Sequence, residues 1–193
     1  MSARADPIAA LERFAGSRAA LLLVAAWGFV EAVAFPVVPD VLLGILALAA
    51  PRRAVPLFLA AVGGALVGSV VLAALAAADP GAIRGLLVAL PGIHVAMLDD
   101  AARATASGDP FALALFGPGT PLKVYTASWV AGAGSIPGLL VAVAINRVTR
   151  IVPGVAALAI AGLVAPGWVR RHGRLVTLGY AASWIALYAR YWA

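Results

Sequence analysis

The chain has 193 residues, of which 64% are hydrophobic and only 11% are charged, and its mean hydropathy is +1.02. Because a soluble domain carries about 25% charged residues, this composition excludes a water-soluble globule and indicates an integral membrane protein. Basic residues outnumber acidic ones by 14 to 8, but no basic helix or aromatic platform accompanies them, so nucleic acid is not an expected partner. The lack of cysteine excludes disulfides and thiolate metal sites.

The N-terminal part of the chain carries several charged side chains before the first apolar stretch and shows no small-residue cleavage pattern. We therefore expect residues 1–18 to form a cytoplasmic N-terminal segment and not a cleaved signal peptide. The two histidines, His94 and His172, lie in predicted loops, so neither a metal site nor a cofactor is expected.

Five apolar blocks follow, at residues 19–50, 54–78, 110–134, 136–165 and 175–193. A spanning helix needs about 20 apolar residues, and the second block meets this length without a charge. Its Gly64 and Gly68 have the spacing that lets helix backbones approach closely. Residues 166–193 are expected to form a cytoplasmic loop and a C-terminal transmembrane helix. That helix ends in aromatic residues beside Arg190, typical of an interfacial anchor: Trp184, Tyr188, Tyr191 and Trp192.

The first block, residues 19–50, contains two prolines three positions apart, Pro36 and Pro39. They remove two backbone donors and prevent a continuous helix. Such a break is tolerated in hydrocarbon only where protein or a water-filled cavity covers the freed backbone groups. The block is therefore expected to be a re-entrant pair of half-helices whose bend lies inside the membrane.

The third block, residues 110–134, repeats this pattern with Pro118 and Pro121, which stand at a constant offset from Pro36 and Pro39. Each unit would contain a re-entrant hairpin and one spanning helix, which makes the two copies inverted in the bilayer, an architecture found in transporters. The predicted fold class is therefore an all-α integral membrane protein with two inverted repeats and a C-terminal transmembrane helix.

Between the two units, residues 79–109 are too short in uncharged length to span, and an amphipathic interfacial helix broken at Pro91 is predicted. The arginines favour the side that carries the N-terminus by eight to three. This bias predicts a multi-pass protein of the inner membrane with a cytoplasmic N-terminus. The same count results if both hairpins cross fully, so it does not bear on re-entry.

Five ionisable residues fall inside apolar blocks: Glu31, Asp40, Lys123, Arg147 and Arg150. Each unpaired charge at the bilayer centre costs about 2.5 to 3.5 kcal/mol, so these side chains must pair or face water. Glu31 and Asp40 lie on opposite arms of the first hairpin, and Lys123 has the matching place in the second. Together the five would form a site with a net charge of about +1, with proton-responsive carboxylates and anion-binding bases.

Other interpretations of these residues remain open from the sequence. Arg147 and Arg150 would lie at the membrane surface if the real span were 151–169. In a further interpretation the carboxylates pair with arginine only to lock helices together. An intramembrane hydrolase would need a nucleophile with no histidine at its depth, so an enzyme is not expected. The candidate nucleophiles would be Ser128, Ser135 and Thr126.

Three stretches carry a resemblance to a known family. Glu31–Leu42 has an acidic residue before a Pro-x-x-Pro-acid bend, Phe116–Gly132 contains Phe-Gly-Pro-Gly-Thr-Pro-Leu-Lys-Val-Tyr, and Asn146–Arg150 follows in the fourth block. Over residues 25–165 the chain resembles the DedA family, also called the SNARE-associated or VTT-domain membrane proteins, most closely its small YqaA-like branch.

The resemblance implies a membrane domain at residues 19–165 with two facing re-entrant hairpins. It also implies movement of lipids between leaflets, such as phospholipids or polyprenyl phosphate carriers, with proton coupling in some members. The family's acidic positions map onto Glu31 and Asp40. The chain departs from the pattern because no arginine precedes Pro118, and Lys123 stands where a later arginine is expected. Lysine offers a point charge in place of a planar fork.

The leading hypothesis is therefore a transporter or scramblase for lipids or other anionic amphiphiles, with membrane lipids as partners. An anionic phospholipid or a polyprenyl phosphate is the expected substrate class. The alternative is a non-transporting membrane scaffold whose buried charges pair structurally. The oligomeric state stays open, with a homo-oligomer among the alternatives.

Overall fold

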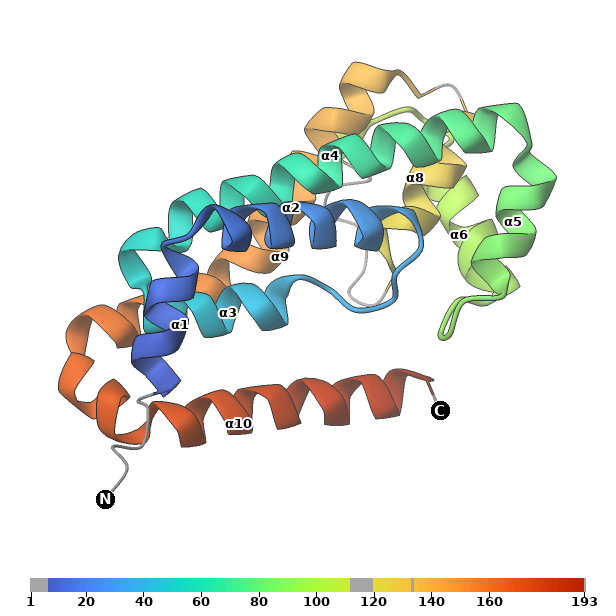
Figure 1. Cartoon of the computed structure of the whole chain (residues 1–193). Coiled ribbons are helices and arrows are strands. Elements are labelled where there is room, and N and C mark those ends of the chain that lie inside the picture. Colours follow the sequence, from blue (N-terminus) through green and yellow to red (C-terminus); the bar gives the residue numbers. More distant parts are fainter. Residues whose placement is uncertain (1–6, 112–119, 133, 193) are drawn as a thin grey trace.

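The computed structural model describes residues 7–111, 120–132 and 134–192, and these residues are all-helical, with no strand (Figure 1). The all-α class predicted from the sequence is therefore confirmed for them. In chain order the helices are α1 (Pro7–Ala15), α2 (Arg18–Val33), α3 (Asp40–Ala49), the 3-10 turn η1 (Pro51–Arg53), α4 (Ala54–Ala78), α5 (Pro80–Val88), α6 (Val95–Thr105), α8 (Leu122–Ala131), α9 (Ile136–Val164) and α10 (Pro166–Trp192).

Two helices are long and apolar enough to cross a membrane. They are α4, which has 28 residues together with η1, and α9, which has 29. A third crossing results if α1 and α2, bent by 78° at their junction, are taken as one span. The helix of α9 continues through Pro153. Length and composition thus support the prediction of a membrane protein.

The C-terminal region differs from the expected loop and separate helix. Residues 166–174 are helical and form the first turns of α10, since Pro166 is compatible with the first position of a helix. Among the described residues, α10 is not one of the helices that are apolar enough to cross a membrane. Its arginines, Arg170, Arg171, Arg174 and Arg190, lower the hydropathy of both ends.

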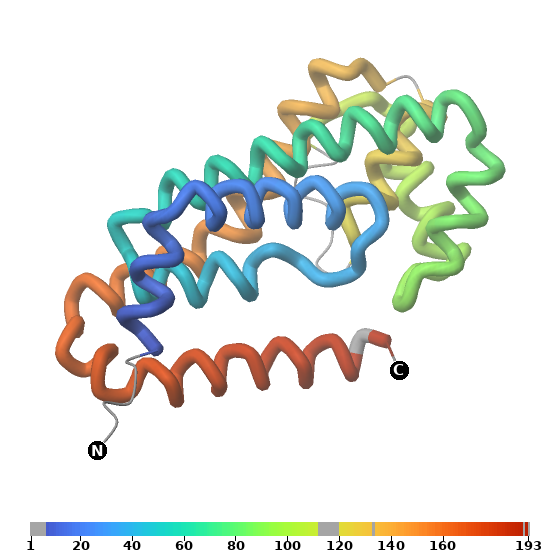
Figure 2. Tube along the Cα trace, in the orientation of Figure 1, coloured from blue at the N-terminus to red at the C-terminus, as the bar shows by residue number. Residues whose placement is uncertain are grey.

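α2 packs along α4 through small residues (Figure 2). A Cβ added at Gly64 would overlap the carbonyl oxygen of Ala25, and one added at Gly28 would overlap that of Ala61. Only glycine fits at either position. The close backbone approach predicted from Gly64 and Gly68 is therefore confirmed, because a Cβ at Gly68 would also lie 2.5 Å from the carbonyl oxygen of Phe29.

The chain reverses direction between α2 and α3 (Figure 1). α2 ends at Val33 and α3 begins at Asp40, so both Pro36 and Pro39 lie in or at the end of the non-helical connection. This break follows from the two missing backbone donors. The two arms then separate, since α2 packs on α4 whereas α3 packs on α9.

α8 begins directly after Pro121 and packs against α4 and α6. Pro118 and most of the first arm of the predicted hairpin at 110–134 lie outside the described residues. Each of the short helices α3 and α8 thus contacts a long helix that does not follow it in the chain, α9 for α3 and α4 for α8.

The segment 79–109 forms two helices, α5 and α6, which are joined by a turn at Pro91 and Gly92. Gly92 has a φ of 76°, which favours glycine. Arg84 of α5 forms an ion pair with Asp99 of α6 at 2.9 Å. The predicted helix broken at Pro91 is therefore present, and its membrane position stays a prediction.

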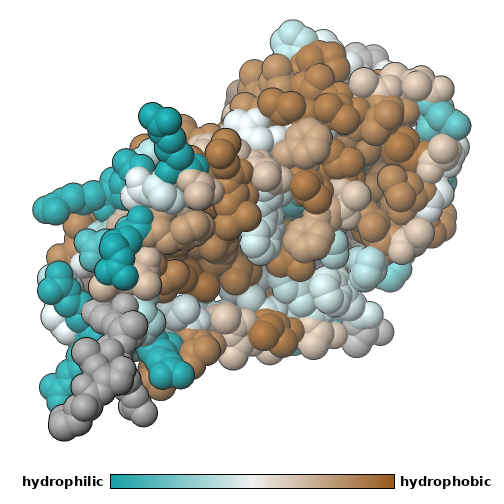
Figure 3. Space-filling view, viewed as in Figure 1, coloured by the Kyte–Doolittle hydropathy of each residue, from teal (hydrophilic) through white to brown (hydrophobic). Residues whose placement is uncertain are grey.

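The beginning of α2 and the end of α3 lie at the same end of the molecule. The guanidinium of Arg53 donates hydrogen bonds to the carbonyl oxygens of Ala15, at 3.4 Å, and Gly16, at 3.2 Å. Figure 3 shows hydrophilic residues gathered at this end, where α1 lies, and apolar residues over much of the remaining visible surface. We call this end, with Arg13, Arg18, Arg52, Arg53 and Arg170, the basic end.

The tight contact between α2 and α4 is testable at two adjacent positions. Gly64→Ala is expected to lower the free energy of unfolding by about 1 to 3 kcal/mol, because its Cβ would overlap the backbone of α2. Gly63→Ala is the matched control, since a Cβ at Gly63 has no atom within 4 Å. Thermal unfolding in detergent measures both; equal melting temperatures for the two variants would contradict the packing.

Candidate functional site

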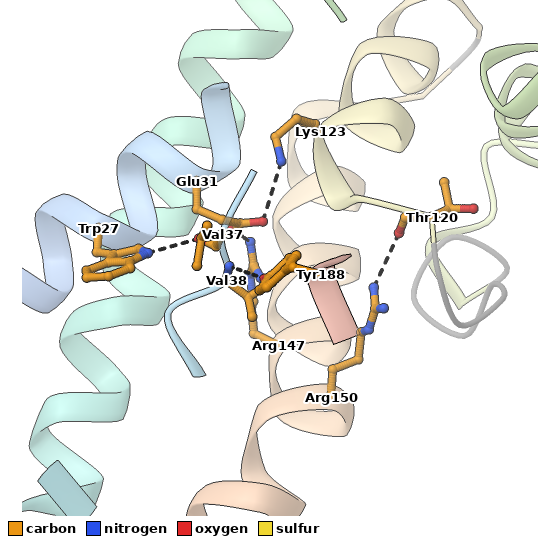
Figure 4. A network of polar contacts seen from close by, with 9 residues as sticks. All are labelled: Trp27, Glu31, Val37, Val38, Thr120, Lys123, Arg147, Arg150 and Tyr188. Atoms are coloured by element: carbon orange, nitrogen blue, oxygen red, sulfur yellow. Dashed lines mark hydrogen bonds and ion pairs between the residues drawn. The ribbon is translucent and has the colours of Figure 1, made fainter. Parts of the chain in front are cut away.

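Glu31 bridges two buried cations that come from different parts of the chain (Figure 4). Its Oε1 lies 3.7 Å from Nζ of Lys123, and its Oε2 accepts a hydrogen bond from Nη2 of Arg147. All three residues are at most 5% exposed. Glu31 lies in the last turn of α2, Lys123 lies in the first turn of α8 and Arg147 lies within α9, so one carboxylate connects three helices.

A cavity of about 460 Å³ adjoins this triad and is lined by all five charged residues that the sequence singled out: Glu31, Asp40, Lys123, Arg147 and Arg150. We call it the charged cavity. Three bases and two acids give it a formal net charge of +1. It lies beside the middle part of a helix long enough to cross a membrane, because Arg147 stands well inside α9, several turns from either end.

The two remaining charged residues are less tightly held. Asp40 is partly buried, and the ion pairs of the described residues do not include it. Arg150 is exposed, and its Nη1 donates a hydrogen bond to the carbonyl oxygen of Thr120 at 3.3 Å. Of the two arginines of α9, Arg147 is therefore buried within the protein and Arg150 lies on its surface.

The prolines of the bends lie at the same place. Pro36 and Pro121 line the charged cavity, and Pro39 is buried at the N-terminus of α3. Pro118 is outside the described residues. Because proline cannot donate a backbone hydrogen bond, these positions carry no unsatisfied N–H toward the cavity.

Side chains complete the backbone hydrogen bonds of the first bend. The indole Nε1 of Trp27 donates to the carbonyl oxygen of Val37 at 2.9 Å, and the N–H of Val38 donates to the hydroxyl of Tyr188 at 2.8 Å (Figure 4). Two backbone groups of the connection between α2 and α3 thus have side-chain partners.

α10 provides one wall of the charged cavity, which the sequence reasoning missed. Trp184 and Tyr188 line it, and the hydroxyl of Tyr180 donates to the carbonyl oxygen of Asp40 at 3.1 Å. The rings of Tyr180, Trp184, Tyr188 and Trp192 contact one another in succession. Their regular i, i+4 spacing places them on one helix face and was visible in the sequence. The aromatic residues had been interpreted only as an interfacial anchor.

The triad retains unused capacity for an anion. Two cations face one carboxylate, and the buried Nε of Arg147 has no hydrogen-bond partner among the described residues. A buried donor without a partner is costly, and a charge-assisted hydrogen bond is among the strong ones. The oxygens of a phosphate bound beside Arg147 would accept a hydrogen bond from its Nε and would balance the excess positive charge of the triad. The neighbouring Asn146 is also buried, and the site predicted from the sequence does not include it.

Two of the three candidate nucleophiles of a hydrolase, Ser128 and Ser135, have structural contacts, whereas the buried hydroxyl of Thr126 has no hydrogen-bond partner among the described residues. The hydroxyl of Ser128 donates to the carbonyl oxygen of Val124 at 3.0 Å, and that of Ser135 accepts from the N–H of Gly138 at the start of α9. In the part of the chain that the structure describes, no group of three His, Cys, Asp or Glu residues is arranged to hold a metal ion.

No family model, curated protein or solved structure matches the chain. The resemblance to the DedA family therefore stays a prediction based on the three stretches named in the sequence analysis. The charged cavity and its surroundings are the basis for a proposed function.

The role of Glu31 as a shared counterion is testable by stability. Glu31→Gln is expected to lower the free energy of unfolding by about 3 to 5 kcal/mol, because it leaves two buried cations without their carboxylate. Asp99→Asn is the control, since its ion pair with Arg84 is about half exposed and exposed pairs contribute at most about 1 kcal/mol. Chemical denaturation in detergent would contradict this role if both variants lost the same small amount.

Proposed function

We propose that the chain is a transporter or scramblase of the DedA type for anionic lipids or other anionic amphiphiles. The observation that carries this proposal is the charged cavity itself: five charged residues from four helices line one space beside the middle of a membrane-length helix. Its net positive charge suits a phosphate headgroup. The proposal contains no catalytic step.

The geometry of the first bend supports a re-entrant hairpin. α2 has 16 residues and α3 has 10, which correspond to about 24 and 15 Å of helix. Both are shorter than the hydrocarbon core of about 30 Å. The contact of Arg53 with Ala15 and Gly16 brings the end of α3 back to the start of α2, as a re-entrant hairpin requires.

The packing also supports two inverted repeats. One and the same sequence offset relates the start of α3 at Asp40 to that of α8 at Leu122, and the start of α4 at Ala54 to that of α9 at Ile136. The long helices α4 and α9 lead away from and toward the basic end, respectively (Figure 1). Each short helix packs on the long helix of the other unit, α3 on α9 and α8 on α4, as expected for two units related by a pseudo-twofold axis.

The positive-inside rule favours a cytoplasmic location for the basic end. The opposite end, with α5 and α6, carries Asp79, Asp99, Asp100 and Asp109 against two arginines, Arg84 and Arg103. We therefore propose a multi-pass inner-membrane protein with a cytoplasmic N-terminus, in which the charged cavity lies near mid-depth.

The proposed mechanism is an exchange of counterions. In the observed state Glu31 neutralises part of the charge of Lys123 and Arg147. A phosphate headgroup entering the charged cavity would take over these cations, and a proton on Glu31 or Asp40 would remove the competing negative charge. A carboxylate that exchanges a basic partner for a proton is a common basis of coupling in membrane proteins.

A scaffold without transport is the second candidate, and one observation favours it. Glu31 is already paired with both buried cations, as expected if the charges only hold helices together. The two functions differ in what they require of Asp40 and Arg150, which line the cavity without belonging to the triad. Transport needs their charges, whereas a scaffold does not.

The topology is testable by labelling single cysteines in this naturally cysteine-free chain. In intact cells a membrane-impermeant thiol reagent is expected to leave Arg13→Cys and Arg52→Cys unlabelled and to label Ser107→Cys at the opposite end; opening the cells exposes the first two. All three positions are exposed. Labelling of Arg52→Cys from outside would mean that the first block crosses fully.

Transport is testable with variants that spare the triad. In liposomes with a labelled anionic phospholipid, Arg150→Gln is expected to slow leaflet exchange at least about tenfold, since one lost charge contact with the headgroup is worth about 1.4 kcal/mol or more. Asp40→Asn is expected to change the pH dependence of the exchange, because it removes a carboxylate that would take up a proton. The matched controls are Arg103→Gln, at an exposed position of α6, and Asp109→Asn, at an exposed position shortly after the end of α6.

The amount of folded protein, followed by gel filtration, separates the two candidate functions. Normal abundance with slowed exchange for Arg150→Gln and an altered pH dependence for Asp40→Asn supports transport. Exchange that is equal with and without the protein, or unchanged in both cavity variants, would overturn it in favour of the scaffold.

A further inference from the structure

A second cavity, of about 490 Å³, lies at the basic end and shares no lining residue with the charged cavity. Its walls come from α1, from the end of α3 with η1, and from the junction of α9 and α10. Its charged lining residues are Glu12, Arg52, Arg53 and Arg170. We call it the basic-end cavity.

The charges of this cavity are unbalanced. Three arginines face one glutamate, and none of the ion pairs in the described residues involves any of the four. Arg53 is fixed by its hydrogen bonds to the carbonyl oxygens that end α1. Arg52 and Arg170 are exposed. The cavity therefore has a formal net charge of +2, with one guanidinium group held by hydrogen bonds and two that are exposed. Guanidinium groups bind phosphate in a planar, bidentate manner.

The edge of this cavity is apolar. Leu163 lines it and is 53% exposed, and the neighbouring Val164 is 78% exposed. Trp168 stands one turn further along, exposed at the start of α10, and tryptophan favours the level of lipid headgroups. A ligand with a phosphate group and a hydrocarbon chain would match the arginines and this edge at the same time.

We infer that the basic-end cavity binds the phosphate of an anionic phospholipid from the leaflet on the side of the N-terminus, as a resident ligand distinct from the transported one. The bound phosphate would connect α1, η1 and α10 through Arg53, Arg52 and Arg170. It would thereby fix the start of α10, the helix whose far half forms a wall of the charged cavity. This inference does not depend on transport.

The test is thermal unfolding of the purified full chain in neutral detergent, with three additions: phosphatidylglycerol, phosphatidylcholine and inorganic phosphate. At ten times the Kd, phosphatidylglycerol is expected to raise the melting temperature by roughly 3 to 6 °C, and the other two by less. The double variant Arg52→Gln with Arg170→Gln should lose most of this rise, the remainder coming from lipid bound in the charged cavity. The matched double variant Arg84→Gln with Arg103→Gln should keep it.

Two further variants protect the conclusion. Glu12→Gln removes the one acidic group of the basic-end cavity and should strengthen the effect of phosphatidylglycerol, even if the double variant does not fold. If Arg150→Gln abolishes the rise and the double variant keeps it, the lipid binds only in the charged cavity; the inference is then overturned and the proposed function stands. An equal rise with inorganic phosphate would overturn the assignment to a lipid.

Discussion

A single carboxylate, that of Glu31, determines how the middle of this molecule is assembled. Burying an ionic group costs several kcal/mol unless its partners are well placed, and Glu31 finds both of its partners on helices that come much later in the chain. The last turn of α2, the first turn of α8 and the middle of α9 must therefore meet at one point. α2 ends at Val33 and α8 begins at Leu122. The ends of these two helices therefore lie close to the three charged side chains.

The sequence predicted those features whose incorrect placement in a membrane would cost much free energy. Charges inside apolar blocks and paired prolines are both costly in lipid, which is why the five cavity residues and the break between α2 and α3 could be predicted. The separation of Arg147 from Arg150 could not, because side chains three positions apart on a helix differ by about 60° in direction. One reaches Glu31 and the other reaches Thr120. The wall formed by α10 was missed because aromatic residues suit a membrane interface equally well.

Under the proposed repeat, the corresponding helices α4 and α9 have different roles. When α4 is aligned with α9 at their first residues, Gly64, Ala65 and Gly68 correspond to Asn146, Arg147 and Arg150. The small residues let α2 lie against the backbone of α4. At the corresponding positions of α9, Arg147 and Arg150 line the charged cavity. The close contact in one unit and the cavity in the other thus coincide with small residues in α4 and arginines in α9 at two corresponding positions.

The chain contains thirteen arginines and only one lysine, and that lysine is Lys123. Its ammonium stands 3.7 Å from Glu31, whereas Arg147 is in direct hydrogen-bond contact with the other carboxylate oxygen. An ammonium on a flexible four-carbon stem turns toward a newcomer more easily than a guanidinium held in place. Under the proposed exchange of counterions, Lys123 is therefore the cation that turns first toward an arriving anion, before Arg147 releases Glu31.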